Sequence, residues 1–237
     1  MSNPLLKDSV FKVSVGSNEF MSVSGVINKS IILWCLLLTG AFYSWIHSNI
    51  IMPLINPIAI VAFALALIMV FKKTASPILA PVYAVCEGLV LGTISLLFEK
   101  LYPGIIVNAV LLTICVLFCM LAAYKTGLLK ATPRFQKIII LSMFAIALVY
   151  IIDFVLNLFG SGHFSYIHNS SGFGIVISFA IVVIAALNLI IDFDLIEQNV
   201  NYNAPKYMEW YSAFSLMVTL VWLYMEVVRF LSKLKKD

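Results

Sequence analysis

The sequence predicts an all-α, polytopic membrane protein whose seven transmembrane helices leave no room for a separate soluble domain. Of its 237 residues, 62% are hydrophobic and only 11% are charged, and the mean hydropathy is +1.05. Soluble domains carry about 45–50% apolar and about 25% charged residues. This composition excludes a soluble enzyme, and it also excludes a nucleic-acid-binding protein in spite of the net charge of +4.

Seven stretches are long and apolar enough to cross a hydrocarbon core about 30 Å thick, which takes roughly 20 helical residues. They cover residues 30–46, 51–71, 77–97, 105–124, 138–159, 173–193 and 210–231. Short connections favour antiparallel neighbours in one bundle. We therefore expect a polar N-terminal tail over 1–29, a seven-helix domain over 30–232 and a basic tail over 233–237.

Polar residues and turn-forming residues mark where the predicted spans begin and end along the chain. The polar start of the chain has no apolar core of a signal peptide. Lys72 and Lys73 separate the second and third spans, both of which contain prolines that permit kinks. A polar turn over 99–103 closes the third span, a basic loop over 125–137 follows the fourth, and a loop near 203–205 joins the last two.

The distribution of Lys and Arg predicts the orientation of the bundle in the membrane. Ten of the 15 basic residues fall on the side of the N-terminus and five on the other side. This places the N-terminus in the cytoplasm and, with seven spans, the C-terminus outside. The Lys-rich C-terminus conflicts with that assignment, and a re-entrant seventh segment would put both ends in the cytoplasm. Short loops throughout fit a bacterial inner membrane.

Carboxylates inside the spans are the candidate functional residues, because a charge in the hydrocarbon core costs at least a few kcal/mol. The candidates are Glu87, Asp153, Asp192, Asp194 and Glu226. Arg229 is the basic residue at comparable depth. So many acids with so few cations must share protons, bind a cation or face water.

Depth along the spans suggests two pairs of carboxylates. Glu87 near the midplane would lie with Asp192 in the inner third, and Asp153 would lie with Glu226 in the outer third. Hard oxygen ligands suit Ca²⁺, so Glu87 and Asp192 form a candidate Ca²⁺ site. The alternative is that each carboxylate only forms a hydrogen bond with a neighbouring helix and has no role in ion transport.

Asp194 is expected at the level of the lipid headgroups. Lys72 and Lys73 could reach the inner carboxylates as a latch or could extend to the headgroups, and Arg229 is the corresponding partner in the outer half.

Several segments resemble the Bax inhibitor-1 family, also called the transmembrane Bax inhibitor motif family, and its bacterial branch in particular. The main segments are IIDFDLIEQ (190–198) and LVWLYMEVVRFLSKL (220–234). Supporting segments are VSGVINKSI (23–31), EGLVLG (87–92) and FEKLYPGI (98–105). The resemblance implies two helix triplets around a central seventh helix and a pH-sensitive Ca²⁺ leak.

The resemblance also implies a proton-sensitive latch of two aspartates, one on each of the last two helices. Asp192 matches the first aspartate. The second has two alternatives here: the LYMEVV segment selects Glu226, and helix depth selects Thr219, two turns earlier on the same face.

Three hypotheses for function follow. The first is a pH-gated cation leak or transporter without a resident cofactor, in which Ca²⁺ or H⁺ is the ion moved or sensed. The second is a regulator without transport that binds another membrane protein, such as a quality-control protease or a cell-death factor. The third, an intramembrane protease using Asp153 and Asp192, lacks the motifs expected of one, so we expect no enzyme.

Overall fold

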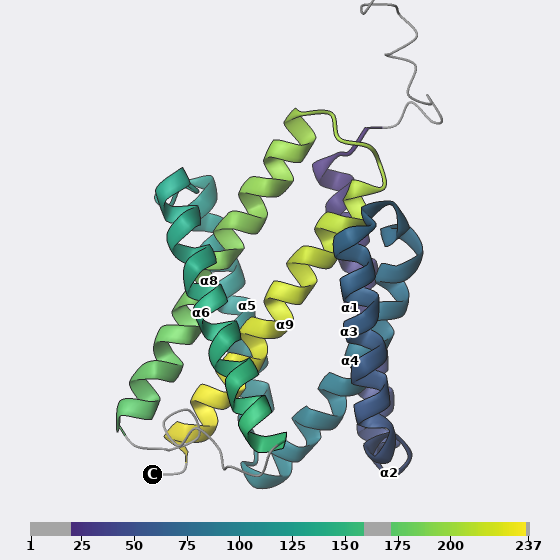
Figure 1. Cartoon of the computed structure of the whole chain (residues 1–237), viewed down its shortest axis with the longest axis vertical. Helices are drawn as coiled ribbons and strands as arrows, with labels where there is room; N and C mark the ends of the chain where they lie inside the picture. The colour runs from purple at the N-terminus through teal and green to yellow at the C-terminus, as the bar shows by residue number, and fades with distance from the viewer. Residues whose placement is uncertain (1–19, 159–171, 236–237) are drawn as a thin grey trace, which may run out of the picture.

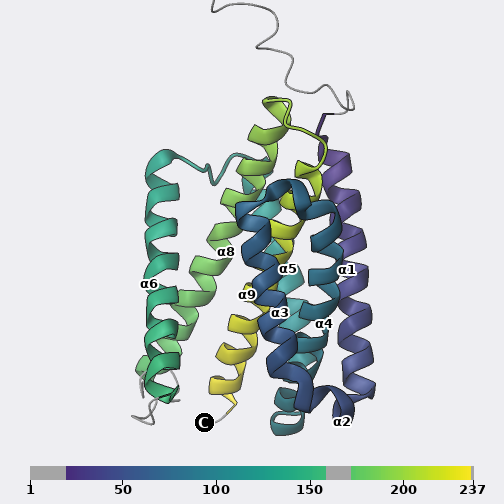
Figure 2. The ribbon, with the colours of Figure 1, turned by 45° about the vertical axis from the view of Figure 1, so that its right-hand side comes forward.

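The structure, a computed structural model, describes residues 20–158 and 172–235 as a bundle of long helices (Figures 1 and 2). The helices are α1 (Val23–Ile46), α2 (Ser48–Ile51), α3 (Ile55–Phe71), α4 (Ser76–Leu101), α5 (Ile105–Lys125), α6 (Pro133–Leu158), α8 (Gly172–Asn201) and α9 (Met208–Leu234), with 3₁₀ turns η2 (Met52–Leu54) and η3 (Lys73–Ala75). Within the described residues, seven helical segments are long and apolar enough to cross a membrane, with residues 48–71 counting as one. The predicted seven-span fold is confirmed.

Several helices begin earlier or end later than the predicted spans. Ser22 caps α1 by accepting a hydrogen bond from the Gly25 N–H at 3.0 Å. Residues 23–29, predicted as part of the tail, therefore form the first two turns of α1. Helix α8 continues past the predicted limit of 193 to Asn201.

The helices form two groups around α9. Helices α1, α3 and α4 pack together, and α5 and α6 both pack on α8. Helix α9 lies between the groups and contacts α1, α4, α5 and α8 (Figure 1). Two triplets around a central seventh helix are thus observed, and α9 is one unbroken helix of 27 residues, which is long and apolar enough to cross a membrane.

Helices α1 and α9 both begin at the end of the bundle that is uppermost in Figures 1 and 2. We call this end the N-terminal end, and we call the other one the opposite end.

Helices α1 and α4 touch through their backbones. A Cβ atom added to Gly88 would lie 2.2 Å from the Leu37 carbonyl oxygen, and one added to Gly92 would lie 2.2 Å from that of Ala41. Close approach at small residues is a usual way to pack helices in lipid, where no hydrophobic effect drives them together. The buried hydroxyls of Ser44 and Thr93 bond across the same interface at 2.6 Å.

Replacing Gly88 by Ala should destabilise the protein, because the α1 backbone has to move away. Overpacking of this kind costs about 1–3 kcal/mol. Thermal unfolding of the detergent-solubilised protein measures the loss. Gly172→Ala is the control, since nothing lies within 4 Å of its added Cβ. Equal melting temperatures for the two variants would contradict the close contact.

Candidate functional site

Asp192 lies on α8 at the interface with α9, with only 6% of its surface exposed. The Ser215 hydroxyl on α9 donates a hydrogen bond to Asp192 Oδ1 at 3.1 Å. Among the described residues, Asp192 Oδ2 has no hydrogen-bond partner. A buried, unsatisfied carboxylate oxygen is costly, so the site favours a bound proton, a water molecule or a cation.

A small cavity of about 40 Å³ lies against this carboxylate. Its polar lining comes from Asn199 on α8 and from Tyr211, Ser212 and Ser215 on α9. Because a water molecule needs about 10–15 Å³ of such space and two to four polar partners, the cavity has the size and lining for one water or one small cation.

A second polar contact joins the same two helices one turn deeper. The Asn188 side-chain amide donates to the Thr219 hydroxyl at 3.1 Å, and both residues are buried. Thr219 also interacts with the Asp192 carboxylate. Of the two alternatives for the second latch residue, Thr219 therefore lies in the Asp192 group, together with Ser215, which no motif in the sequence indicated.

Glu226 belongs to a separate cluster nearer the opposite end. Its Oε1 accepts hydrogen bonds of 2.9 Å from the Tyr150 hydroxyl on α6 and from Arg229. The Arg229 guanidinium also lies 5.1 Å from the centre of the Tyr150 ring. Glu226 is almost fully buried, and its charge is balanced by a half-exposed Arg229. Asp153 lies one turn beyond Tyr150 on α6 and is partly buried.

The predicted pairing of Glu87 with Asp192 is not formed. Glu87 is partly buried on α4, and its side-chain neighbour is Tyr83, one turn earlier. Tyr83 packs edge-on against Phe214 of α9, with ring centres 5.0 Å apart. In the described part of the chain, no group of three or more His, Cys, Asp or Glu side chains could hold a metal ion.

Among the residues that the structure describes, neither Lys72 nor Lys73 is in contact with the inner carboxylates. Lys72 and Lys73 are exposed, and Lys73 Nζ lies 5.0 Å from the centre of the Tyr211 ring, a cation–π contact. Since Tyr211 lines the Asp192 cavity, Lys73 lies near its rim without an ion pair to the carboxylate. Asp194 accepts hydrogen bonds from Gln136 and Gln198, which ties α8 to α6.

A buried ion pair that no motif in the sequence indicated joins α1 to α9. Glu209 is 2% exposed, and its Oε2 lies 2.7 Å from Lys29 Nζ. Its Oε1 accepts hydrogen bonds from the backbone N–H and the hydroxyl of Ser22. Gly25 makes room for the carboxylate, because an added Cβ would lie 1.9 Å from Oε1.

Sequence alone gave little signal for this pair. Glu209 precedes the predicted seventh span, and Lys29 closes the predicted tail, so both fall outside the predicted spans.

Fold and site together define a seven-helix membrane protein with a buried carboxylate between its last two helices. A family model described as Bax inhibitor 1 like matches residues 3–236. The chain therefore belongs to the Bax inhibitor-1-like family, as its motifs predicted. Neither a curated protein nor a solved structure gives a significant match.

Replacing Lys29 by Met should destabilise the protein, because the Glu209 carboxylate loses its charge partner inside the bundle. Leaving a buried group unsatisfied costs about 1–3 kcal/mol, and more when it is charged. Thermal unfolding in detergent provides the measurement. The double variant Lys29→Met/Glu209→Gln should recover part of the loss, since the glutamine oxygen can still accept from Ser22. A double variant no more stable than Lys29→Met would contradict this role.

Proposed function

We propose that the protein is a pH-sensitive leak pathway for cations, with Ca²⁺ as the main ion, and that Asp192 is its proton-sensitive group. The observation that carries this proposal is the buried Asp192 carboxylate, which has one free oxygen facing a small polar cavity between α8 and α9. Membership of the Bax inhibitor-1-like family supports it, since that family is linked to calcium leak.

The mechanism follows from the two charge states of Asp192. As an anion, the carboxylate accepts from Ser215 and attracts a cation into the cavity. Once protonated, it loses that attraction and becomes a donor, so its hydrogen bonds must rearrange. Because it links α8 to α9, the change of charge alters the packing of these two helices.

Glu87 and Glu226 serve as further oxygen sites along the pathway, at the middle of the bundle and nearer the opposite end. Asp192, Glu87 and Glu226 lie at three different depths in the bundle. This separation fits an ion that moves from one carboxylate to the next, since a tightly held Ca²⁺ takes six to eight oxygen ligands at once. Lys73 above Tyr211 adds positive charge at the rim of the Asp192 cavity, where it slows cation entry.

We further propose that the N-terminal end faces the cytoplasm of a bacterial inner membrane, following the basic residues on that side. The protein acts without a resident cofactor and without catalysis. An aspartyl protease needs two carboxylates that share a proton, and no second carboxylate bonds Asp192 among the described residues.

Replacing Asp192 by Asn should abolish the pH dependence of Ca²⁺ flux, because asparagine cannot change its charge. Flux is measured between pH 6 and 8 in liposomes that contain the purified protein. Glu197→Gln is the matched control: it removes an exposed carboxylate from the same helix and should keep the wild-type pH profile.

No flux above empty liposomes from folded protein would refute the leak and favour a regulator that binds another membrane protein. Flux whose pH profile is the same in wild type and Asp192→Asn would keep the leak and exclude Asp192 as its sensor.

A further inference from the structure

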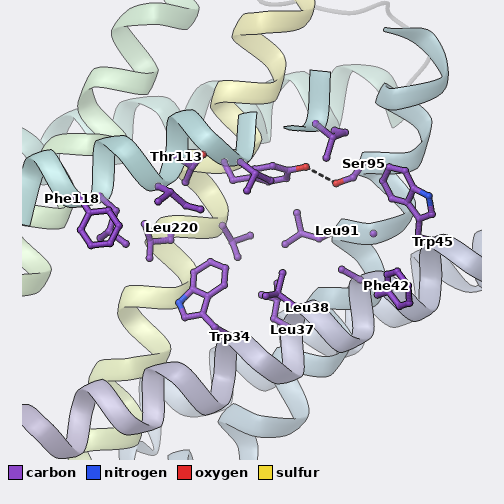
Figure 3. A pocket seen from close by; sticks show the side chains of 18 residues that line it. Trp34, Leu37, Leu38, Phe42, Trp45, Leu91, Ser95, Thr113, Phe118 and Leu220 are labelled. Carbon is purple, nitrogen blue, oxygen red and sulfur yellow. Dashed lines mark hydrogen bonds between the residues drawn. The ribbon is translucent and has the colours of Figure 1, made fainter. Parts of the chain in front are cut away.

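A large cavity of about 860 Å³ lies between α1, α4, α5 and α9, apart from the carboxylates (Figure 3). Side chains such as Trp34, Leu37, Leu91, Phe118 and Leu220 form its walls. Its volume falls within the roughly 300–1,000 Å³ of small-molecule binding sites. The proposed ion pathway does not use this cavity.

The hydroxyl groups in the cavity wall already have hydrogen-bond partners. Ser95 and Tyr224 bond to each other at 2.7 Å, as Figure 3 shows, and Thr113 donates to the Ala109 carbonyl at 2.8 Å. A water molecule needs two to four polar partners, and apolar cavities stay dry. The lining therefore favours an apolar ligand over water or an ion.

The cavity is continuous with the surface that faces lipid. Its lining includes Leu38 and Phe42 of α1 and Phe118 of α5, and each of these three residues is more than half exposed. Helices α1 and α5 form no substantial interface with each other. The gap between them is therefore open to the acyl region of the bilayer.

The height of the cavity matches one leaflet of the membrane. Trp45 is the second-last residue of α1 and Ile106 is the second residue of α5, so the cavity starts at the opposite end of the bundle. At 1.5 Å per residue, Trp34 lies about 16 Å along α1 from Trp45, and Phe118 lies about 18 Å along α5 from Ile106. Half of the hydrocarbon core measures about 15 Å.

We propose that this cavity binds an acyl chain of a membrane phospholipid from the leaflet at the opposite end of the bundle. The headgroup lies at the level of Trp45, and the chain runs inward to Trp34 and Phe118. A partner helix is too large, since a cylinder about 10 Å wide and 30 Å long occupies about 2,400 Å³. The bound chain fills the gap between α1 and α5 and so joins the two helix groups on this face.

Photolabelling tests the proposal on the full chain. The protein is placed in nanodiscs of phosphatidylcholine that include an analogue with a diazirine halfway along one acyl chain. After irradiation, labelled residues are mapped by peptide mass spectrometry. Labelling of the cavity residues on α1 and α5 should exceed that of lipid-facing α6 residues at the same depth at least fivefold. Equal labelling would overturn the proposal.

Two neighbouring variants on α5 separate the cavity from the general lipid surface. Val110 lines the cavity and is 41% exposed, so Val110→Trp should fill it and reduce labelling of α1 at least fivefold. Leu111 is 57% exposed and does not line it, so Leu111→Trp should leave labelling unchanged. If Val110→Trp does not fold, Leu38→Trp fills the cavity from α1. Undiminished labelling in a folded, filled variant would refute the site.

Native mass spectrometry in a mild detergent identifies the occupant. A retained mass of one phospholipid, lost in the cavity-filling variant, is expected. The mass of a free fatty acid alone, or of a protein dimer that the filling variant disrupts, would overturn the assignment to a phospholipid chain.

Discussion

The need to satisfy polar side chains out of contact with water determines how α9 sits in the bundle. In hydrocarbon, every polar group must find a partner within the protein. Polar side chains of α9 bond to both groups of helices. In the first group, Glu209 bonds to Ser22 and Lys29 at the start of α1, and Tyr224 bonds to Ser95 of α4. In the second group, the pairs are Ser215 with Asp192, Thr219 with Asn188 and Lys233 with Ser178, all to α8, and Glu226 with Tyr150 of α6. These contacts fix the rotation and depth of α9, which apolar packing alone would leave open.

The two halves of the bundle are held together in different ways. Helices α1 and α4 meet backbone to backbone at Gly88 and Gly92, with little freedom to slide. Helix α6 packs mainly on α8, and its polar contacts include those of Gln136 with Asp194 and of Tyr150 with Glu226. In the proposed mechanism, a change of charge at Asp192 acts on the interface between α9 and α8, which belongs to this second group of helices.

The sequence was sufficient to predict the seven spans, the two helix groups and a carboxylate inside the bundle at Asp192, because hydropathy and motif resemblance each leave a clear signal. It could not predict the partners of that residue. Helix α6 is apolar all round and gives no periodicity to show which face meets a neighbour, so Tyr150 carried no signal, and Ser215 is one of several hydroxyl residues along α9. Depth alone suggested pairing Glu87 with Asp192, but α4 turns Glu87 towards Tyr83 of its own helix.

The ion pair between Lys29 and Glu209 has a consequence for the order in which the protein assembles. Glu209 bonds to Ser22, which lies 187 positions earlier in the chain. Because α9 is synthesised last, the start of α1 has no partner for Lys29 until nearly the whole chain has entered the membrane. Closure of the bundle is thus a late, long-range step, and a chain truncated before α9 would leave a lysine and an exposed helix face for quality control to recognise.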